Sequence, residues 1–207
     1  MDEHVIHHEQ TNPIFTIGHS THSMADFLDF LLFYKIDALI DVRSTPFSRI
    51  SHFNRDFLTQ ALKSSQIKYG WLGNQLGARR VEKDCYVNGQ ARYDNIAVLN
   101  VFKSGINRIL KGSISHKIVI MCSEKEPLDC HRTLLICREL KRYKLNIRHI
   151  LSNGRLEEHA DTEERLMKLM NIAPNLFRLN ESKEDLLEEA YNARSEQIAY
   201  RMIESMT

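Results

Sequence analysis

The sequence predicts an α/β fold in which an open, mostly parallel sheet is flanked by helices and followed by a C-terminal helical appendage. Short apolar runs alternate with amphipathic segments, which indicates parallel crossover units. These runs are nearly continuous, as strands buried on both faces are. The chain has 207 residues, of which 43% are hydrophobic and 27% charged, and this length and composition are typical of one globular domain. We place an α/β core at residues 12–155 and an acidic helical extension, packed on that core, at 156–207.

Five apolar runs are expected to be strands: residues 14–17, 38–42, 67–72, 117–121 and 147–151. Helical spacing and capping residues predict helices at 23–34, from Asn54 onward, and at 93–110, 129–143, 161–170 and 183–202. The segment 73–90 is rich in Gly, Asn and charge and is interpreted as a loop.

Charge is distributed unevenly along the chain. Residues 43–93 hold nine Lys/Arg and three Asp/Glu, whereas residues 153–207 hold seven and twelve. The overall net charge of +1 excludes a strongly basic, histone-like protein. The asymmetry favours an anionic partner on one face, and two ordinary solvated surfaces are the alternative.

Four cysteines occur, at positions 85, 122, 130 and 137. The first eleven residues are polar and His-rich, without the apolar stretch of a signal peptide. No stretch reaches the roughly 18–20 apolar residues that span a bilayer. We therefore expect a cytoplasmic protein with reduced thiols and no membrane partner.

Polar clusters follow three of the predicted strands and open one helix. They are Gly18-His19-Ser20, Asp41-Val42-Arg43-Ser44, Cys122-Ser123-Glu124 and Cys130-His131-Arg132. Ligands bind outside the carboxyl ends of strands in open parallel sheets, so we expect one common pocket there. The candidate catalytic residues are His19, Asp41, Glu124 and His131, since buried carboxylates and imidazoles suit acid/base chemistry. Each could instead be a hydrogen-bonded buried polar group.

The predicted helix start at Asp129 suggests an anion site. Asp129 can cap the helix, whose first turn carries partial positive charge. His131 and Arg132 add more positive charge there, and a bound anion such as phosphate would relieve the conflict. In the alternative reading, Arg132 pairs with Asp41 or Glu124 as scaffolding.

Residues 43–93 interleave cations with aromatic side chains, a pattern that suits nucleotide or nucleic-acid binding. The segment from Gly73 to Arg80 contains glycine and ends in two arginines, which predicts a mobile loop that binds an anion. Aromatic residues are more often core, as we expect for Phe53 and Phe57. The candidate substrate- and phosphate-binding residues are Ser20, Arg43, Ser44, Arg49, Asn54, Trp71, Arg79, Arg80 and Arg132.

Cys130 is a possible thiolate nucleophile, because a helix start beside His and Arg lowers a thiol pKa. We favour the alternative that it is a small buried hydrophobe, and we assign Cys122 and Cys137 to the core. The spacing of Cys122, Cys130 and His131 matches no usual zinc pattern, so no metal and no cofactor is predicted. A zinc site assembled with His19 stays open as an alternative.

Several of these motifs, in the same order, resemble domain-of-unknown-function family 488. They are Thr16-Ile17-Gly18-His19-Ser20, Asp41-Val42-Arg43 with Pro46, Ser48-Arg49, Phe53-Asn54, Leu76-Gly77 with Arg79, Cys122-x-Glu124, Cys130-His131-Arg132, and His149 with Gly154. The resemblance runs from about residue 14 to 154. It implies an α/β fold and an intracellular location, and no settled activity.

Leu39-Ile40-Asp41-Val42-Arg43 also resembles the strand-end Asp-x-Arg of rhodanese-like domains. Those domains place a catalytic Cys six residues before an Arg, whereas Cys122 lies ten residues before Arg132 and Cys130 two.

Three functional hypotheses remain from the sequence. The leading one is an enzyme that acts on a nucleotide or nucleic acid by hydrolysis or glycosidic cleavage. The second is a thiol enzyme that uses Cys130. The third is a non-catalytic module that senses a nucleotide or docks a partner through the acidic tail. The sequence gives no oligomeric state.

Overall fold

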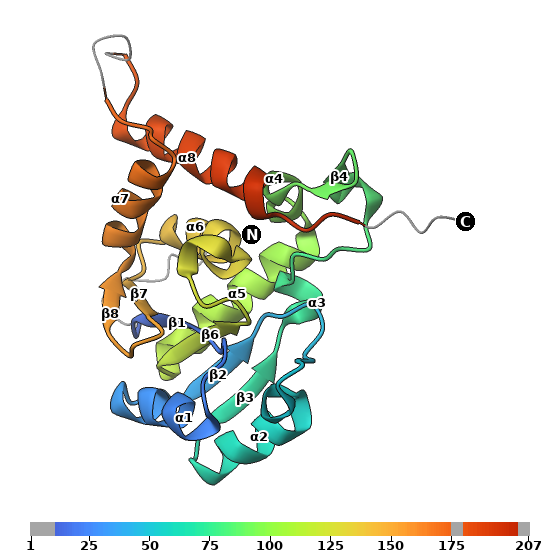
Figure 1. The fold of residues 1–207 in the computed structure, drawn as a ribbon, viewed down its shortest axis with the longest axis vertical. Helices are drawn as coiled ribbons and strands as arrows, with labels where there is room; N and C mark the ends of the chain where they lie inside the picture. Colours follow the sequence, from blue (N-terminus) through green and yellow to red (C-terminus); the bar gives the residue numbers. More distant parts are fainter. Residues whose placement is uncertain (1–10, 175–179, 203–207) are drawn as a thin grey trace, which may run out of the picture.

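A six-stranded sheet lies at the centre of the computed structural model, which describes residues 11–174 and 180–202 (Figure 1). The strand order is β3-β2-β6-β1-β7-β8, and only β8 runs antiparallel to its neighbour. The strands are β1 (Ile14–Gly18), β2 (Ala38–Asp41), β3 (Lys68–Trp71), β6 (Ile118–Cys122), β7 (Ile147–Ile150) and β8 (Leu156–Glu158). The predicted α/β class with a mostly parallel sheet is confirmed, and β8 is a strand within the segment that we assigned to the helical extension.

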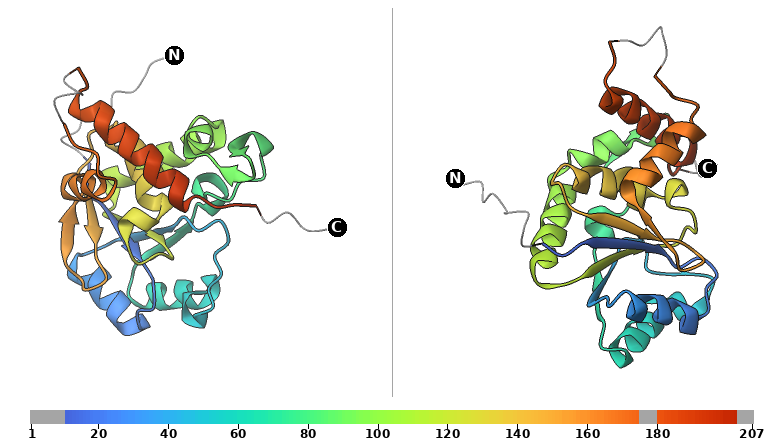
Figure 2. Two further views of the ribbon diagram at one scale, coloured as in Figure 1. Left: turned by 45° about the horizontal axis from the view of Figure 1, so that its top comes forward. Right: turned by 90° about the vertical axis from the view of Figure 1, so that its left-hand side faces the viewer.

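Helices cover both faces of this sheet (Figure 2). The helices α1 (Met24–Phe33) and α2 (Arg55–Ser64) cover one face, and α5 (Asn100–Ser115) and α6 (Arg138–Lys141) cover the other. Successive strand side chains point to opposite faces. Leu39 and Val119 accordingly belong to the core under α1 and α2, and Ile118 and Ile120 to the core on the far side.

The prediction that Phe57 belongs to the core is wrong, because 60% of its surface is exposed. Leu58 and Leu62 lie four residues apart and form the buried face of α2, which turns Phe57 toward solvent. Phe53 is buried as expected. It lies in the short 3-10 turn η2 (Ser51–Phe53).

The segment between β3 and β6 is more structured than the sequence indicated. The predicted loop contains α3 (Gly73–Leu76), η3 (Lys83–Cys85) and a two-stranded hairpin, β4 (Tyr86–Val87) and β5 (Gln90–Ala91). The expected helix at 93–110 is divided into α4 (Tyr93–Ala97) and α5. The backbone of Leu99 is extended, with ψ at 136°, and this interrupts the helix.

The helix expected from Asp129 begins later, at Arg132. A 3-10 turn, η4 (Pro127–Asp129), comes first, and Cys130 then takes an extended conformation that separates the two segments. Asp129 therefore caps no helix, and its carboxylate pairs with Arg194. The first part of the helix, η5 (Arg132–Cys137), is π-helical, a form that is frequent at functional sites.

Two further helices, α7 (His159–Leu169) and α8 (Lys183–Ile198), pack together beyond the sheet (Figure 1). The long helix α8 buries Leu186, Leu187 and Tyr191. None of the described helices has the length and apolar character needed to cross a membrane. The polar, His-rich residues 1–10 lie outside the described part of the chain.

Candidate active site

A pocket of about 500 Å³ lies at the carboxyl ends of β2 and β6. Its walls come from the end of β6 and the segments after both strands, from residues 78–79, from the start of α4, and from the end of α8 and the chain that follows it. The lining residues are Arg43, Ser44, Thr45, Phe47, Ala78, Arg79, Tyr93, Cys122, Ser123, Glu124, Asp129, His131, Ile198 and Tyr200. Five sequence-predicted site residues are among them. Arg43, Ser44, Glu124 and His131 were expected at this edge of the sheet, and Arg79 was expected in an anion-binding loop.

Asp41 and Arg43 form a fully buried ion pair at the end of β2. The distance from Arg43 Nη2 to Asp41 Oδ2 is 2.6 Å, and Arg43 Nε donates to Oδ1 at 2.9 Å. Tyr69 donates its hydroxyl to the same carboxylate at 2.9 Å. Arg43 Nη2 also donates to the carbonyl of Phe53. The Asp41 carboxylate is therefore saturated, and it positions Arg43 rather than facing the pocket.

His19 completes this group. Its Nε2 lies 3.3 Å from Arg43 Nη1 and its Nδ1 lies 3.0 Å from the carbonyl of Ser20. An arginine only donates and a carbonyl only accepts, so Nδ1 carries the proton. Burial and the charge of Arg43 lower the pKa of His19 to about 4. The ring stacks on Phe53 and stays neutral, with its lone pair bound by Arg43.

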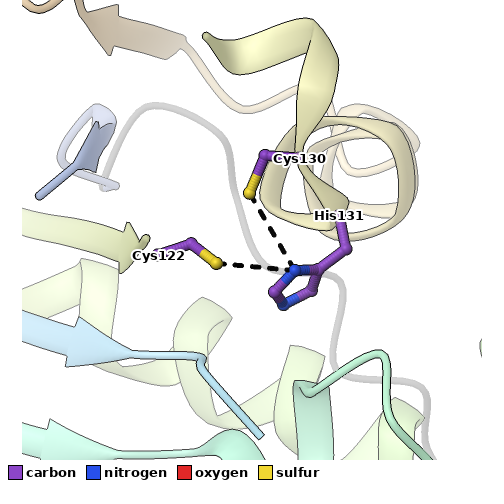
Figure 3. A group of neighbouring side chains, drawn as sticks. All are labelled: Cys122, Cys130 and His131. Atoms are coloured by element: carbon purple, nitrogen blue, oxygen red, sulfur yellow. Dashed lines mark hydrogen bonds between the residues drawn. The ribbon is translucent and has the colours of Figure 1, made fainter. Parts of the chain in front are cut away.

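A second cluster, which we call the thiol cluster, consists of Cys122, Glu124, Cys130 and His131. The two sulfurs lie 3.6 and 3.9 Å from His131 Nδ1, between the end of β6 and the start of η5 (Figure 3). Both thiols donate to Glu124 Oε2, at 3.0 Å from Cys122 and 3.3 Å from Cys130. His131 Nε2 lies 3.2 Å from the carbonyl of Val42, which ties this cluster to the end of β2.

Burial and mutual charges perturb the titration of the thiol cluster. Burial and the neighbouring Cys130 raise the pKa of Glu124. Burial by itself would raise the pKa of Cys130, but the hydrogen bond from Cys122 and the charge of Arg132 outweigh it and lower that pKa well below its usual value. Burial by itself would lower the pKa of His131, but the contact with Cys130 outweighs burial, so that pKa is raised. The shift at Cys130 therefore comes from its polar neighbours and not from solvent, since only 1% of its surface is exposed.

Arg132 lies outside the pocket lining and is completely buried. Its Nη1 donates to the backbone carbonyl of Glu124 at 2.7 Å and its Nη2 to that of Lys125 at 3.3 Å. The structure thus places Arg132 as scaffolding for the loop after β6, through carbonyls instead of the carboxylates of Asp41 or Glu124.

The other candidate binding residues also lie outside the pocket lining. Trp71 donates to the carbonyl of Arg43, Asn54 accepts from the backbone of Ser48, and Arg80 is paired with Glu82. Ser20 has a positive φ of 45° and bonds to the backbone of Ser123, and Arg49 is exposed. The structure therefore separates Arg79, which lines the pocket, from its neighbour Arg80.

Several pocket residues were missed in the sequence. Tyr200 follows α8, and the guanidinium of Arg79 lies 4.8 Å from its ring centre. Phe47 stands at the pocket wall with 67% of its surface exposed. Phe47 belongs to the interleaved cations and aromatics of residues 43–93, and this pattern was the available signal for it. No sequence pattern linked Tyr200 to residues 120 positions earlier.

Comparison with known families gives one finding. The sequence model of a family described as "Domain of unknown function DUF488" matches residues 23–138, more than half of the chain. The matched stretch includes Arg43, Arg79, Glu124 and the two cysteines of the thiol cluster. The likeness to rhodanese-like domains is not shown by this match. No curated protein and no solved structure matches the chain.

Proposed function

Because the chain belongs to the family described as domain of unknown function DUF488, a description that assigns no activity, we propose its function from the site itself. We propose an enzyme that binds a nucleotide or nucleic-acid substrate in the pocket and cleaves it by acid/base chemistry. The observation that carries the proposal is the placement of the Arg79 guanidinium and the Glu124 carboxyl in the walls of one pocket, where both side chains are accessible to a ligand.

Anion binding falls to Arg79 in this proposal. The guanidinium of Arg43 is already bound by Asp41, Phe53 and His19, and Asp129 is paired with Arg194. Arg79 stacks on Tyr200, an arrangement that leaves the edge of its guanidinium available for a phosphate. The backbone N–H of Arg79 donates to Ser44 Oγ at 3.0 Å, which fixes the start of this wall against the end of β2.

The pocket has the size and lining for a nucleotide. Its volume of about 500 Å³ lies within the range of small-molecule sites, roughly 300–1,000 Å³. Phe47, Tyr93 and Tyr200 contribute aromatic surface beside Arg79. Bases stack on aromatic rings while cations hold their phosphates.

Glu124 is the proposed proton-transfer residue. It lines the pocket, and partial desolvation of its carboxyl and the neighbouring Cys130 raise its pKa, which favours the protonated form that a general acid needs. Asp41, in contrast, is completely buried and saturated by Arg43 and Tyr69, so its proposed role is to position Arg43.

Calorimetric titration of nucleoside monophosphates and short single-stranded oligonucleotides tests the binding. Arg79→Ala should weaken binding by about 10–100-fold, the equivalent of one charge-assisted hydrogen bond of roughly 1.5–3 kcal/mol. Arg142→Ala, which removes an exposed arginine outside the pocket, is the matched control and should bind as the parent does. Failure of every ligand to bind at low salt, or equal affinity in both variants, would contradict the proposal.

The chemical role of Glu124 is tested on any ligand that the parent protein cleaves. Glu124→Gln should retain binding and reduce kcat by about 10²–10⁴-fold, the usual contribution of a general acid or base. An unchanged kcat in this variant would remove Glu124 from the mechanism.

A further inference from the structure

We infer that Cys122, Cys130 and His131 are ligands of a divalent transition-metal ion of the zinc class, bound at the wall of the pocket. One donor atom from each of these three residues lies within 4.8 Å of the other two. The three residues come from the end of β6 and from the start of η5, and all are buried. The inference rests on this donor set alone, so metal uptake and nucleotide binding can fail independently.

The distances between donors fit tetrahedral zinc. Zinc–sulfur bonds of about 2.3 Å and zinc–nitrogen bonds of about 2.0–2.1 Å place the two donors about 3.5 Å apart at a tetrahedral angle. The observed distances from His131 Nδ1 are 3.6 Å to Cys122 Sγ and 3.9 Å to Cys130 Sγ. These two sulfur–nitrogen distances therefore need to shorten by at most a few tenths of an ångström, and the two sulfurs lie within 4.8 Å of each other.

The imidazole of His131 is oriented as a metal ligand. Its Nε2 faces the carbonyl of Val42, which can only accept, so Nε2 carries the proton. The lone pair of Nδ1 then points toward both sulfurs (Figure 3). A backbone carbonyl that holds the second nitrogen is the usual outer partner of a metal-bound histidine.

The surroundings of the sulfurs also suit thiolates. The backbone N–H of Arg132 donates to Cys130 Sγ at 3.4 Å, and the guanidinium of Arg132 lies buried nearby. Cys122 and His131 line the pocket, so the fourth coordination position faces the space where the ligand binds. Glu124 Oε2 contacts both sulfurs, at 3.0 and 3.3 Å, from outside the group of three. Three protein ligands and one open position are typical of catalytic zinc.

Metal titration of the reduced full-length chain, after treatment with a chelator, tests the inference. We expect one equivalent of Zn²⁺ per chain, and Co²⁺ should give an intense thiolate-to-cobalt absorption band. Histidines elsewhere in the chain cannot produce that band, since it requires sulfur. Cys122→Ser and Cys130→Ser should each lose the band, and His131→Gln should lower the affinity at least about tenfold.

Cys137→Ser is the matched control, because Cys137 is a buried cysteine at the end of η5 that lies outside the donor group. It should bind Co²⁺ as the parent does. Thermal melting of each variant shows whether a lost cobalt band follows from unfolding. Cys122→Ala and Cys130→Ala are alternative single substitutions if a serine variant does not fold. The inference is overturned if the parent gives no thiolate band, or if folded Cys122 and Cys130 variants keep the band of the Cys137 control.

Discussion

The guanidinium of Arg43 is held by the carboxylate of Asp41, two residues earlier, through three hydrogen bonds of 2.6 to 3.2 Å. Both side chains are almost completely buried. The residue between them, Val42, has its carbonyl 3.2 Å from His131 Nε2. The end of β2 is therefore in contact with the thiol cluster at the end of β6.

Asp41→Asn should destabilise the protein strongly, because it leaves the buried charge of Arg43 without a partner. The expected loss in the free energy of unfolding is about 3–5 kcal/mol. Tyr69→Phe, which removes only the hydroxyl bonded to Asp41, should lose about 1 kcal/mol. Urea denaturation of both variants gives the comparison, and a similar small loss in both would show that the pair contributes little.

Phe47→Ala should weaken nucleotide binding by about 1–3 kcal/mol if its ring stacks on a base. The side chain is 67% exposed, so the variant should keep its thermal stability. Phe57→Ala is the matched control, since Phe57 is 60% exposed on α2 and lies outside the pocket lining. Titration of one nucleoside monophosphate measures both, and equal affinities would exclude Phe47 from the binding surface.

Acidic pH should destabilise the fold through two buried histidines. His149 Nε2 lies 2.9 Å from His159 Nδ1, in a buried chain that runs from Thr16 on β1 to Tyr191 on α8. Burial lowers the pKa of His159 to about 4 and that of His149 well below its usual value. Between pH 6.5 and 4 the unfolded chain therefore binds protons that the folded chain does not, and the free energy of unfolding falls as the pH falls.

The variant His159→Gln isolates this effect. Between pH 7 and 5 the parent should lose about 2 kcal/mol more than the variant in its free energy of unfolding, because one such histidine is missing. Urea denaturation at both pH values measures the difference, and carboxylates that titrate in both proteins cancel. Parallel losses in the two proteins would mean that His159 titrates normally in the folded state.

Gly18→Ala should destabilise the protein by about 3 kcal/mol, the upper part of the range for overpacking. A Cβ atom at Gly18 would lie 1.8 Å from the backbone oxygen of Glu124, so the loop after β6 must move. At Gly70 the nearest atom to an added Cβ is the flexible end of Ile40 at 3.2 Å, and Gly70→Ala should be tolerated. Thermal melting compares the two, and equal melting temperatures would contradict the close approach at Gly18.

Much of the fold could be predicted because its signals are local. The buried strand from Ile118 consists of consecutive apolar residues. The side chain of Ser23 accepts a hydrogen bond from the backbone N–H of Asp26, as a helix cap does. The late start at Arg132 and the break at Leu99 were missed, since both follow from backbone conformations that packing imposes. β8 was missed because Leu156–Glu158 is short and polar, and it pairs along one edge only.

The site was predictable only where strand ends fixed it. We predicted that Arg43, Glu124 and His131 lie at one edge of the sheet, because the carboxyl ends of parallel strands meet there, and all three line the pocket. The approach of Cys122 to Cys130 depends on the 3-10 turn between them, and spacing in the sequence does not encode it. Arg132 looked like an anion ligand, but its guanidinium is buried and donates to the backbone carbonyls of Glu124 and Lys125.

A crystal structure of the protein with a bound nucleoside monophosphate tests the central claim most directly. The account predicts the phosphate within hydrogen-bond distance of the Arg79 guanidinium, the base against Phe47 or Tyr200, and the scissile bond near Glu124. A nucleotide bound elsewhere, with this pocket empty at saturating ligand concentration, would contradict the account.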